Sequence, residues 1–267
     1  MKKEMKSFMD LISLRGKTAL VTGAGVGIGK AISIRFGEVG ANLVLVDINE
    51  EGLEQTKEEV LNFGVDVETY KVDLSKKEDI EKLWKDLEGR EPDILVNNAG
   101  IYSFKDFLEL DGDLLEKTMK VNLYSALWMS QEMIGRRKKK GGVIINVGSI
   151  EAILPFAKNL VHYDISKMGV IALTRALARE YGKLGFRVNA VIPGGIETER
   201  VKELKKKGVL KFDVDLMKIA MDFKNRLPLG RFGMPDEVAR IVVILASDVS
   251  SYVHGALVPV DGGFLST

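Results

Sequence analysis

The chain has 267 residues, with 39 Lys plus Arg against 38 Asp plus Glu and a formal net charge of +1 at pH 7. A charge this close to zero provides no field to recruit nucleic acid or an anionic membrane, so we expect a small-molecule partner instead. The sequence contains no cysteine and two histidines. This composition excludes disulfides, thiolate nucleophiles and cysteine-ligated metals, and no metal site is predicted.

Residues 1–15 form a predicted N-terminal extension that mixes charged and apolar side chains. It has no unbroken apolar stretch of the length that a signal peptide or membrane span needs, so we expect a soluble, cytoplasmic protein. Domains usually hold roughly 100–200 residues, but α/β folds often reach about 250. Because no linker or repeat divides the chain, a single domain is predicted over residues 16–267.

Short β-branched runs alternate along the chain with longer segments in which apolar residues recur every three or four positions. The predicted strands lie at 18–21, 42–46, 66–72, 93–96, 143–147, 187–191 and 256–260. The predicted helices lie at 30–39, 50–63, 76–87, 114–134, 166–181 and 236–246. This alternation predicts an α/β fold of Rossmann type: a doubly wound, seven-stranded, mainly parallel sheet with helices on both faces. The irregular stretch 194–228 is a predicted lid over a ligand site.

A glycine-rich segment at 22–29, Thr-Gly-Ala-Gly-Val-Gly-Ile-Gly, follows the first predicted strand and opens a helix. Glycines allow a sharp turn and a close approach of backbone N–H groups to a pyrophosphate at the helix N-terminus. The segment therefore predicts a dinucleotide cradle, and its binding residues are Gly23, Gly27, Ile28 and Gly29. A turn of small residues needed only for packing is the alternative.

Asp47 ends the second predicted strand, about 20 residues beyond the glycine-rich segment. A carboxylate at this place can accept hydrogen bonds from the adenosine ribose. It would also repel a 2′-phosphate, and Val26 offers no cation to balance that repulsion. The sequence therefore favours NAD over NADP. A helix N-cap before Asn49 is the alternative role for Asp47, and the two roles are compatible.

Tyr163 and Lys167 are four residues apart, so on a helix they share one face and the ammonium lies near the phenol. A tyrosine near its reference pKa of about 10 is a poor acid or base at neutral pH, and a neighbouring cation lowers that pKa. Surface packing is the alternative for this pair taken alone. Ser149, at the end of a predicted strand earlier in the chain, makes the pattern more specific.

Taken in order, these motifs resemble those of the short-chain dehydrogenase/reductase family, and the match spans residues 17–263. The other matching positions are Asp73-Leu74, Asn97-Asn98-Ala99-Gly100, Asn122, Pro193-Gly194 and Thr198. Within the family, the chain is similar to 3-oxoacyl-(acyl-carrier-protein) reductases and, around His162, to glucose 1-dehydrogenases. Asp164 and Ile165 depart from the small residues that the family usually has between the tyrosine and the lysine, and Gly195 extends the Pro-Gly turn.

The resemblance implies that Tyr163 is the general acid/base and that Ser149 hydrogen-bonds the substrate oxygen. Lys167 would bind the nicotinamide ribose and lower the pKa of Tyr163. Asn122 would hold a water that links Lys167 to solvent, and a polar break within a helix is the alternative for Asn122. The family's C-terminal pattern, which this chain resembles at 230–235 and 255–263, commonly supports homotetramers.

The resemblance also implies further cofactor contacts. The adenine would be flanked by Asp73 and Leu74, the adenosine ribose lined by Asn98, Ala99 and Gly100, and the nicotinamide amide contacted by Ile196 and Thr198. From the residues alone, Asp73 could equally cap a helix that starts near Ser75, and Asn97-Asn98 could form a turn.

The candidate substrate-binding residues are Ser149, Glu151, Phe156 and Tyr163. Most side chains expected around the reacting carbon are apolar, which favours a secondary alcohol or ketone. Glu151 is the exception: it could bind a hydroxyl of a sugar or polyol, or simply be solvated. We predict an NAD(H)-dependent oxidoreductase that interconverts a secondary alcohol and a ketone. The alternatives are a sugar or polyol dehydrogenase, a 3-oxoacyl thioester reductase and a non-catalytic dinucleotide-binding regulator.

Overall fold

The computed structural model describes residues 5–198 and 221–267. In this part of the chain seven strands form a sheet of order β3-β2-β1-β4-β5-β6-β7, and each neighbouring pair is parallel. The strands are β1 (Thr18–Thr22), β2 (Asn42–Asp47), β3 (Val67–Lys71), β4 (Ile94–Asn97), β5 (Gly142–Val147), β6 (Phe186–Pro193) and β7 (Leu257–Val260). The strand order reverses between β1 and β4, which opens a ligand crevice beyond their carboxyl ends. The predicted fold class is confirmed.

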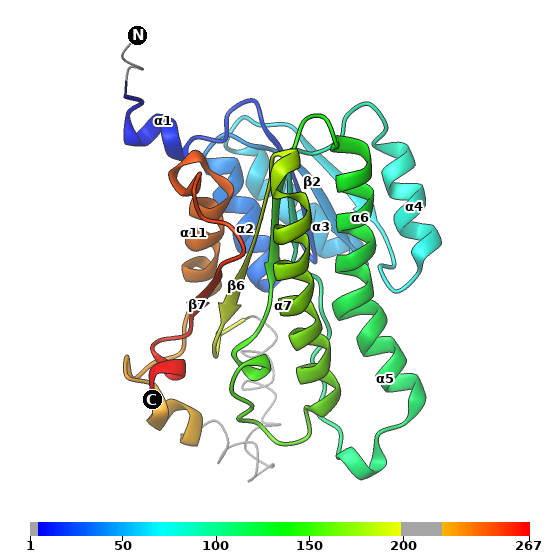
Figure 1. Ribbon diagram of the computed structural model, residues 1–267, viewed down its shortest axis with the longest axis vertical. Helices are drawn as coiled ribbons and strands as arrows, with labels where there is room; N and C mark the ends of the chain where they lie inside the picture. The colour runs from blue at the N-terminus through cyan, green and yellow to red at the C-terminus, as the bar shows by residue number, and fades with distance from the viewer. Residues whose placement is uncertain (1–4, 199–220) are drawn as a thin grey trace.

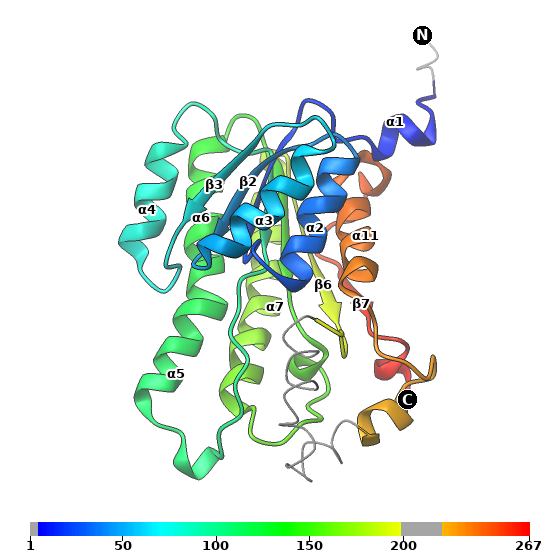
Figure 2. The same ribbon diagram turned by 180° about the vertical axis from the view of Figure 1, so that it is seen from behind.

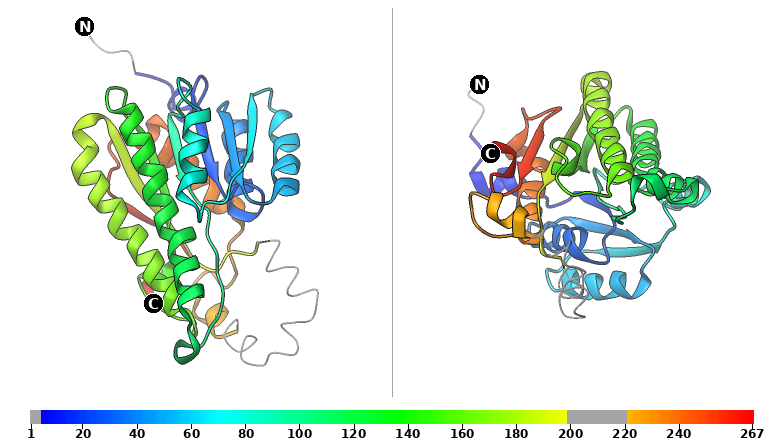
Figure 3. Two further views of the ribbon diagram at one scale, coloured as in Figure 1. Left: turned by 90° about the vertical axis from the view of Figure 1, so that its right-hand side faces the viewer. Right: turned by 90° about the horizontal axis from the view of Figure 1, so that it is seen from below.

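Helices cover both faces of this sheet (Figures 1, 2 and 3). One face carries α2 (Gly27–Glu38), α3 (Glu50–Leu61) and α11 (Pro235–Ala246), and the other carries α4 (Lys77–Asp86), α6 (Ser125–Arg137) and α7 (Val161–Tyr181). Among the elements whose bounds lie in the described residues are also the helices α1 (Phe8–Ile12) and α5 (Gly112–Met119) and the short turns η1 (Phe107–Glu109), η2 (Lys120–Tyr124), η3 (Ile150–Ala152), η4 (Gly182–Leu184), η5 (Asp248–Ser250) and η6 (Phe264–Ser266). The lower ends of α5 and α7 extend beyond the strands on the side toward which β6 points (Figure 1).

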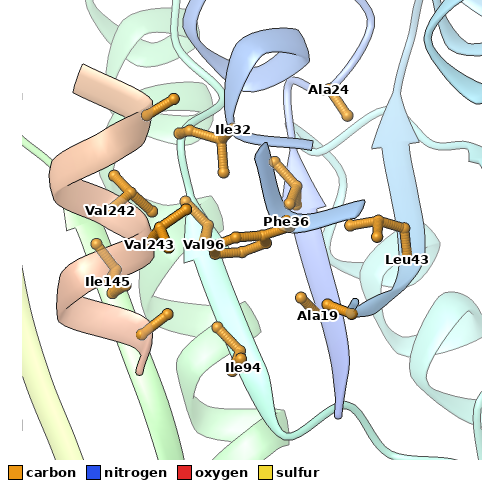
Figure 4. Packing of buried hydrophobic residues seen from close by; sticks show 14 of the residues in the cluster. Ala19, Ala24, Ile32, Phe36, Leu43, Ile94, Val96, Ile145, Val242 and Val243 are labelled. Carbon is orange, nitrogen blue, oxygen red and sulfur yellow. The ribbon is translucent and has the colours of Figure 1, made fainter. Parts of the chain in front are cut away.

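The core has two layers because alternate residues of a strand face opposite sides of the sheet. In β1, Ala19 and Val21 pack under α2, α3 and α11, whereas Leu20 packs under α4 and α6. Phe36 of α2 lies at the centre of the first layer and is fully buried (Figure 4). Trp84 of α4 is the largest buried side chain of the second layer. The two layers fix the helices, so the strand ends and their loops are held in place.

The helices differ from the sequence prediction in several places. The helix predicted at 114–134 is interrupted: α5 and α6 are separated by η2, a π-helical turn that contains Asn122. The helix predicted at 166–181 begins earlier, at Val161, so that Tyr163 and Lys167 both lie on α7. Part of the N-terminal extension forms α1, which Ser7 caps. Of the predicted lid, residues 199–220 lie outside the described residues, and 221–226 are helical.

Candidate active site

The glycine-rich segment turns from β1 into α2. Gly23 has φ +65°, and a Cβ on it would lie 2.8 Å from the Asn98 side-chain nitrogen. A Cβ on Gly29 would lie 2.0 Å from the carbonyl oxygen of Gly23. Close backbone packing therefore requires glycine at these two positions, as the packing alternative proposed. Gly27, at φ +59°, faces Thr198, whose Cγ2 would be 3.4 Å from a Cβ.

The entry to α2 is suited to an anionic ligand. Its N-cap, Val26, provides no side-chain hydrogen bond and is half exposed. A helix N-terminus that lacks a side-chain cap presents backbone N–H groups and the positive end of the helix dipole. Ile28 and Gly29 belong to this first turn, and Thr198 lies across from it at Gly27. The structure thus brings together two segments that the resemblance assigns to the cofactor.

Asp47 ends β2 beside the glycine turn. One of its carboxylate oxygens accepts the N–H of Gly25 at 2.9 Å, and the other accepts the N–H of Asn49 at 2.9 Å. Asn49, and not Asp47, is the side-chain cap of α3, so the N-cap alternative for Asp47 is wrong. A carboxylate has about four acceptor positions, so about two remain open on Asp47.

Asp73 and Leu74 follow β3 at the same edge of the sheet. One Asp73 oxygen accepts hydrogen bonds from the backbone N–H and the hydroxyl of Ser75. These bonds hold the pKa of the Asp73 carboxyl below its usual value. The cap of α4 is Lys76, so Asp73 does not cap that helix. Leu74 is buried in the second core layer.

The segment after β4 is tied to the end of β1. The Thr22 hydroxyl accepts the N–H groups of Asn98 and Ala99 at 3.0 and 3.1 Å. The Asn98 amide donates to the carbonyls of Thr22 and Gly23 at 2.9 and 3.1 Å. Asn98 is therefore a bracing residue of the glycine turn, which goes beyond the simple turn that its sequence suggests. A Cβ on Gly100 would lie 3.5 Å from Lys167 Nζ.

The four candidate catalytic residues lie on three segments. They are Ser149 just after β5, Tyr163 and Lys167 on α7, and Asn122 in η2. Ser149 follows β5, and its Oγ accepts the Glu151 N–H at 3.2 Å, which leaves its proton for the Tyr163 oxygen. Lys167 donates to the Val147 carbonyl at 2.8 Å, and its Nζ lies 5.9 Å from the centre of the Tyr163 ring.

Asn122 lies at the π-helical turn and is buried. Its amide exchanges hydrogen bonds with the backbone of Ile101 at 2.8 and 3.0 Å and donates to the Ser166 hydroxyl at 3.0 Å. The Ser166 hydroxyl in turn donates to the carbonyl of Tyr163 at 2.7 Å. Asn122 is thus more than a polar break in a helix, because it links the segment after β4 to α7.

Burial dominates the proton affinities in this site. It raises the pKa of the Tyr163 phenol to about 12, against the opposing effect of the Ser149 hydrogen bond. It lowers the pKa of the Lys167 ammonium to about 8. In the protein alone the phenol therefore does not have the lowered pKa that the resemblance implies for it.

Glu151 is buried and bound to the backbone. Its carboxylate accepts the N–H of Phe156 at 2.8 Å and that of Ala157 at 3.3 Å. Burial raises the pKa of Glu151, although these N–H groups oppose the rise. The alternative in which Glu151 is simply solvated is therefore wrong. Phe156 packs edge-on against Phe223 and Phe264, with ring centres 5.5 Å from each.

Two residues to which the sequence prediction gave no role, Thr22 and Ser166, support the site. Tyr102, a candidate pocket residue from the sequence, packs its ring edge-on against Tyr163 with centres 4.9 Å apart. Thr22 is the first residue of the glycine-rich segment, and Ser166 directly precedes Lys167. Their position next to predicted site residues is the sequence signal that could have identified them. Tyr102 lies on an irregular segment whose path the sequence does not specify.

The reversal of strand order, the glycine turn and the carboxylate at the end of β2 define a Rossmann-type dinucleotide-binding protein. Comparison with known proteins agrees: a family model described as enoyl-(acyl carrier protein) reductase matches residues 23–265. The chain therefore belongs to the short-chain dehydrogenase/reductase family, and it is an oxidoreductase.

Several relatives align along almost their whole length. A 3-oxoacyl-[acyl-carrier-protein] reductase of Aquifex aeolicus is 34% identical over 94% of this chain and 98% of its own. A 2-dehydro-3-deoxy-D-gluconate 5-dehydrogenase of Bacillus subtilis is 36% identical over 96% of this chain and 98% of its own. Among solved structures, an Agrobacterium tumefaciens protein with bound NADP superposes with a TM-score of 0.86 at 30% identity, covering 97% of this chain and 100% of that one.

Two negative findings apply to the part of the chain that the structure describes. No helix there is long and apolar enough to cross a membrane. In the same residues, no three His, Asp or Glu side chains gather as a metal-ligand set.

Proposed function

We propose that the chain is an NAD-dependent dehydrogenase that interconverts a secondary alcohol and a ketone. The observation that carries the proposal is the convergence of Ser149, Tyr163 and Lys167 beyond the carboxyl ends of the strands. A bound nicotinamide dinucleotide supplies the hydride acceptor at C4 of its ring. The non-catalytic alternative is disfavoured because no member of the catalytic set is missing.

The protein's own groups would handle the proton and the oxygen. The Ser149 hydroxyl, whose lone pair already accepts an N–H, orients the substrate oxygen and stabilises charge on it. Tyr163 takes or returns the proton of that oxygen. Lys167 remains fixed at the Val147 carbonyl, with its Nζ 5.9 Å from the centre of the Tyr163 ring. Asn122 would position a relay water near Lys167.

NAD is proposed over NADP because of Asp47. Both of its oxygens are held by backbone N–H groups, which orient the carboxylate. A 2′-phosphate beside it would meet a like charge. The other proposed cofactor contacts are made by the glycine turn, Asp73 and Leu74, the Asn98–Gly100 segment, and Ile196 with Thr198.

A tyrosine substitution tests the proposed function. Tyr163→Phe removes the phenolic hydroxyl and keeps the ring, so we expect turnover to fall by about 100- to 10,000-fold while NADH still binds, as measured by initial rates and by NADH fluorescence. Tyr181→Phe, at the far end of α7, is the matched control and should behave as wild type. Full turnover by Tyr163→Phe would refute the assignment.

We also propose a domain organisation and an oligomeric state for the protein. We infer a single domain over residues 16–267 with a lid at 194–228; its described part packs Phe223 and Leu227 against the site's aromatic residues. A homotetramer in the cytoplasm is also proposed. Val161, Ile165 and Met168 give α7 an exposed apolar face, which a second copy would cover. Light scattering of the purified protein measures the number of copies.

A further inference from the structure

Tyr102 packs directly against the phenol that is proposed to transfer the proton. Its ring meets the Tyr163 ring edge-on, with ring centres 4.9 Å apart and ring planes at 88°. Edge-to-face pairs with centres roughly 4.5–7 Å apart are a favoured arrangement of aromatic rings. Because the contact is made on the ring of Tyr163, it affects how firmly the phenol is held and how much water reaches it.

The segment that carries Tyr102 is fastened on both sides of that residue. Asn122 holds the backbone of Ile101 through two hydrogen bonds, of 2.8 and 3.0 Å. On the other side, the Ser103 Oγ lies 3.4 Å from Nε2 of His162, which is buried. Tyr102 lies between these two attachments, so its backbone is fixed although the segment is irregular.

Two more contacts continue the same attachment. The Phe104 ring packs edge-on against the Tyr102 ring, with centres 5.1 Å apart. The Lys105 N–H donates to the carbonyl of Asn159 at 2.9 Å. The Tyr102 ring is therefore supported by its own segment as well as by Tyr163.

The ring of Tyr102, and not its hydroxyl, makes these contacts. The hydroxyl forms no hydrogen bond with the residues that the structure describes. The side chain is 41% exposed, so one part of it contacts Tyr163 while another part faces solvent. Tyr102 thus separates one side of the phenol ring from water.

Several groups besides Tyr102 act on the phenol. Burial is the largest effect and raises its pKa to about 12; the Ser149 hydrogen bond opposes this rise, and the carboxylates of Glu151 and Asp164 add to it. The Lys167 Nζ lies 5.9 Å from the ring centre. A variant without the Tyr102 ring keeps all these charged groups and loses part of the cover, so its phenol should have a lower pKa.

We propose that Tyr102 is a positioning residue for proton transfer: its ring holds the Tyr163 ring in place and keeps water from one side of it. This inference rests on the proposed dehydrogenase function, in which Tyr163 transfers the proton. Tyr102 acts here through Tyr163, which is a different role from contact with the substrate.

Substitutions that remove the ring, or only its hydroxyl, test the inference. The assay is the initial rate of oxidation of 2-butanol and of 2,3-butanediol at saturating NAD⁺ over a range of pH. Oxidation needs the ionised phenol, so kcat/KM rises with pH through the pKa of Tyr163. In Tyr102→Ala we expect the midpoint of this rise to move down by about one pH unit. Above the midpoint, where the phenol is ionised in both proteins, kcat should be about tenfold lower because the ring is less firmly held.

Three further variants complete the experiment. Tyr102→Phe keeps the ring and should retain the midpoint and the kcat of wild type. Tyr102→Leu keeps part of the side-chain volume and should show the changes of Tyr102→Ala at smaller size. Phe107→Ala, which removes an exposed aromatic ring from η1, is the matched control and should behave as wild type. NADH fluorescence checks that each variant is folded and binds the cofactor.

The outcomes separate this inference from the function on which it rests. An unchanged midpoint in Tyr102→Ala and Tyr102→Leu, with only the KM for the alcohol raised, would show a substrate contact and overturn the inference. Losses in Tyr102→Phe as large as in Tyr102→Ala would show that the hydroxyl acts, which overturns it as well. In both cases the dehydrogenase function stands. If wild type oxidises no alcohol and reduces no ketone with either cofactor, the proposed function itself fails, and the inference fails with it.

Discussion

Replacing Asp47 by asparagine should change the cofactor preference, because it removes a charge and keeps the size of the side chain. In the structure the carboxylate is held at the end of β2 by the N–H groups of Gly25 and Asn49, so its position is fixed before any ligand binds. A 2′-phosphate about 4 Å away would be repelled by about 1 kcal/mol per charge in a water-like medium and by about 4 kcal/mol at an effective dielectric constant near 20. Asp47 is partly exposed, which favours the lower half of that range.

We therefore expect Asp47→Asn to raise the NADP⁺ to NAD⁺ ratio of kcat/KM by about 10- to 100-fold. The assay is the initial rate with each cofactor at a fixed alcohol concentration. Asp66→Asn, an exposed aspartate immediately before β3, is the matched control and should leave the ratio unchanged. A wild-type enzyme that already prefers NADP⁺, or an Asp47→Asn ratio equal to that of wild type, would refute the electrostatic argument.

Two further predictions concern stability. Phe36→Ala empties the centre of one core layer, so it should lower the free energy of unfolding, measured by urea titration, by about 3–5 kcal/mol. The control is Phe8→Ala on the exposed α1, which should change that free energy by less than about 0.5 kcal/mol. Equal effects of the two variants would contradict the packing described. Glu237 accepts hydrogen bonds from Arg231 and from the Met234 N–H, and its pKa is lowered from 4.5 to about 2, first by Arg231. The contribution of the Glu237 carboxylate to the free energy of unfolding is therefore complete above about pH 4.5 and is lost as the pH falls through 2. Glu237→Gln should lower that free energy by about 1 kcal/mol at pH 7 and by nearly nothing at pH 2. A loss of the same size at both pH values would contradict this sign.

The fold could be predicted because the strands are short, β-branched and buried on both faces. Each predicted strand matches an observed one to within two residues at either end. The predicted start of α2, at residue 30, is three residues too late, because Gly27 and Gly29 in its first turn have low helix propensity. The π-helical turn at Asn122 has no signal in apolar periodicity, since α5 and α6 on either side of it continue one helical pattern.

The candidate site was predictable where chemistry requires a residue type, as for Tyr163 and Lys167 on α7. The burial of those two groups is not predictable from the sequence, because it depends on contacts between segments that are far apart in the chain. The predicted cation effect on the phenol is an example: burial of Tyr163 raises its pKa despite the nearby ammonium. Glu151 is another, since the backbone groups that satisfy it come from a loop five and six residues later.

The bonds around the segment after β4 also have a dynamic consequence. Thr22 and Asn98 attach its beginning to the glycine turn, and Asn122 attaches Ile101 to the π-helical turn and, through Ser166, to the helix of Tyr163. These four pieces of chain are far apart in sequence, yet none of them can shift alone without breaking a hydrogen bond that is at least partly buried. A small displacement of the glycine turn by a ligand would therefore be transmitted to the tyrosine as a rigid movement, which links the cofactor end of the crevice mechanically to the end at which the proton is transferred.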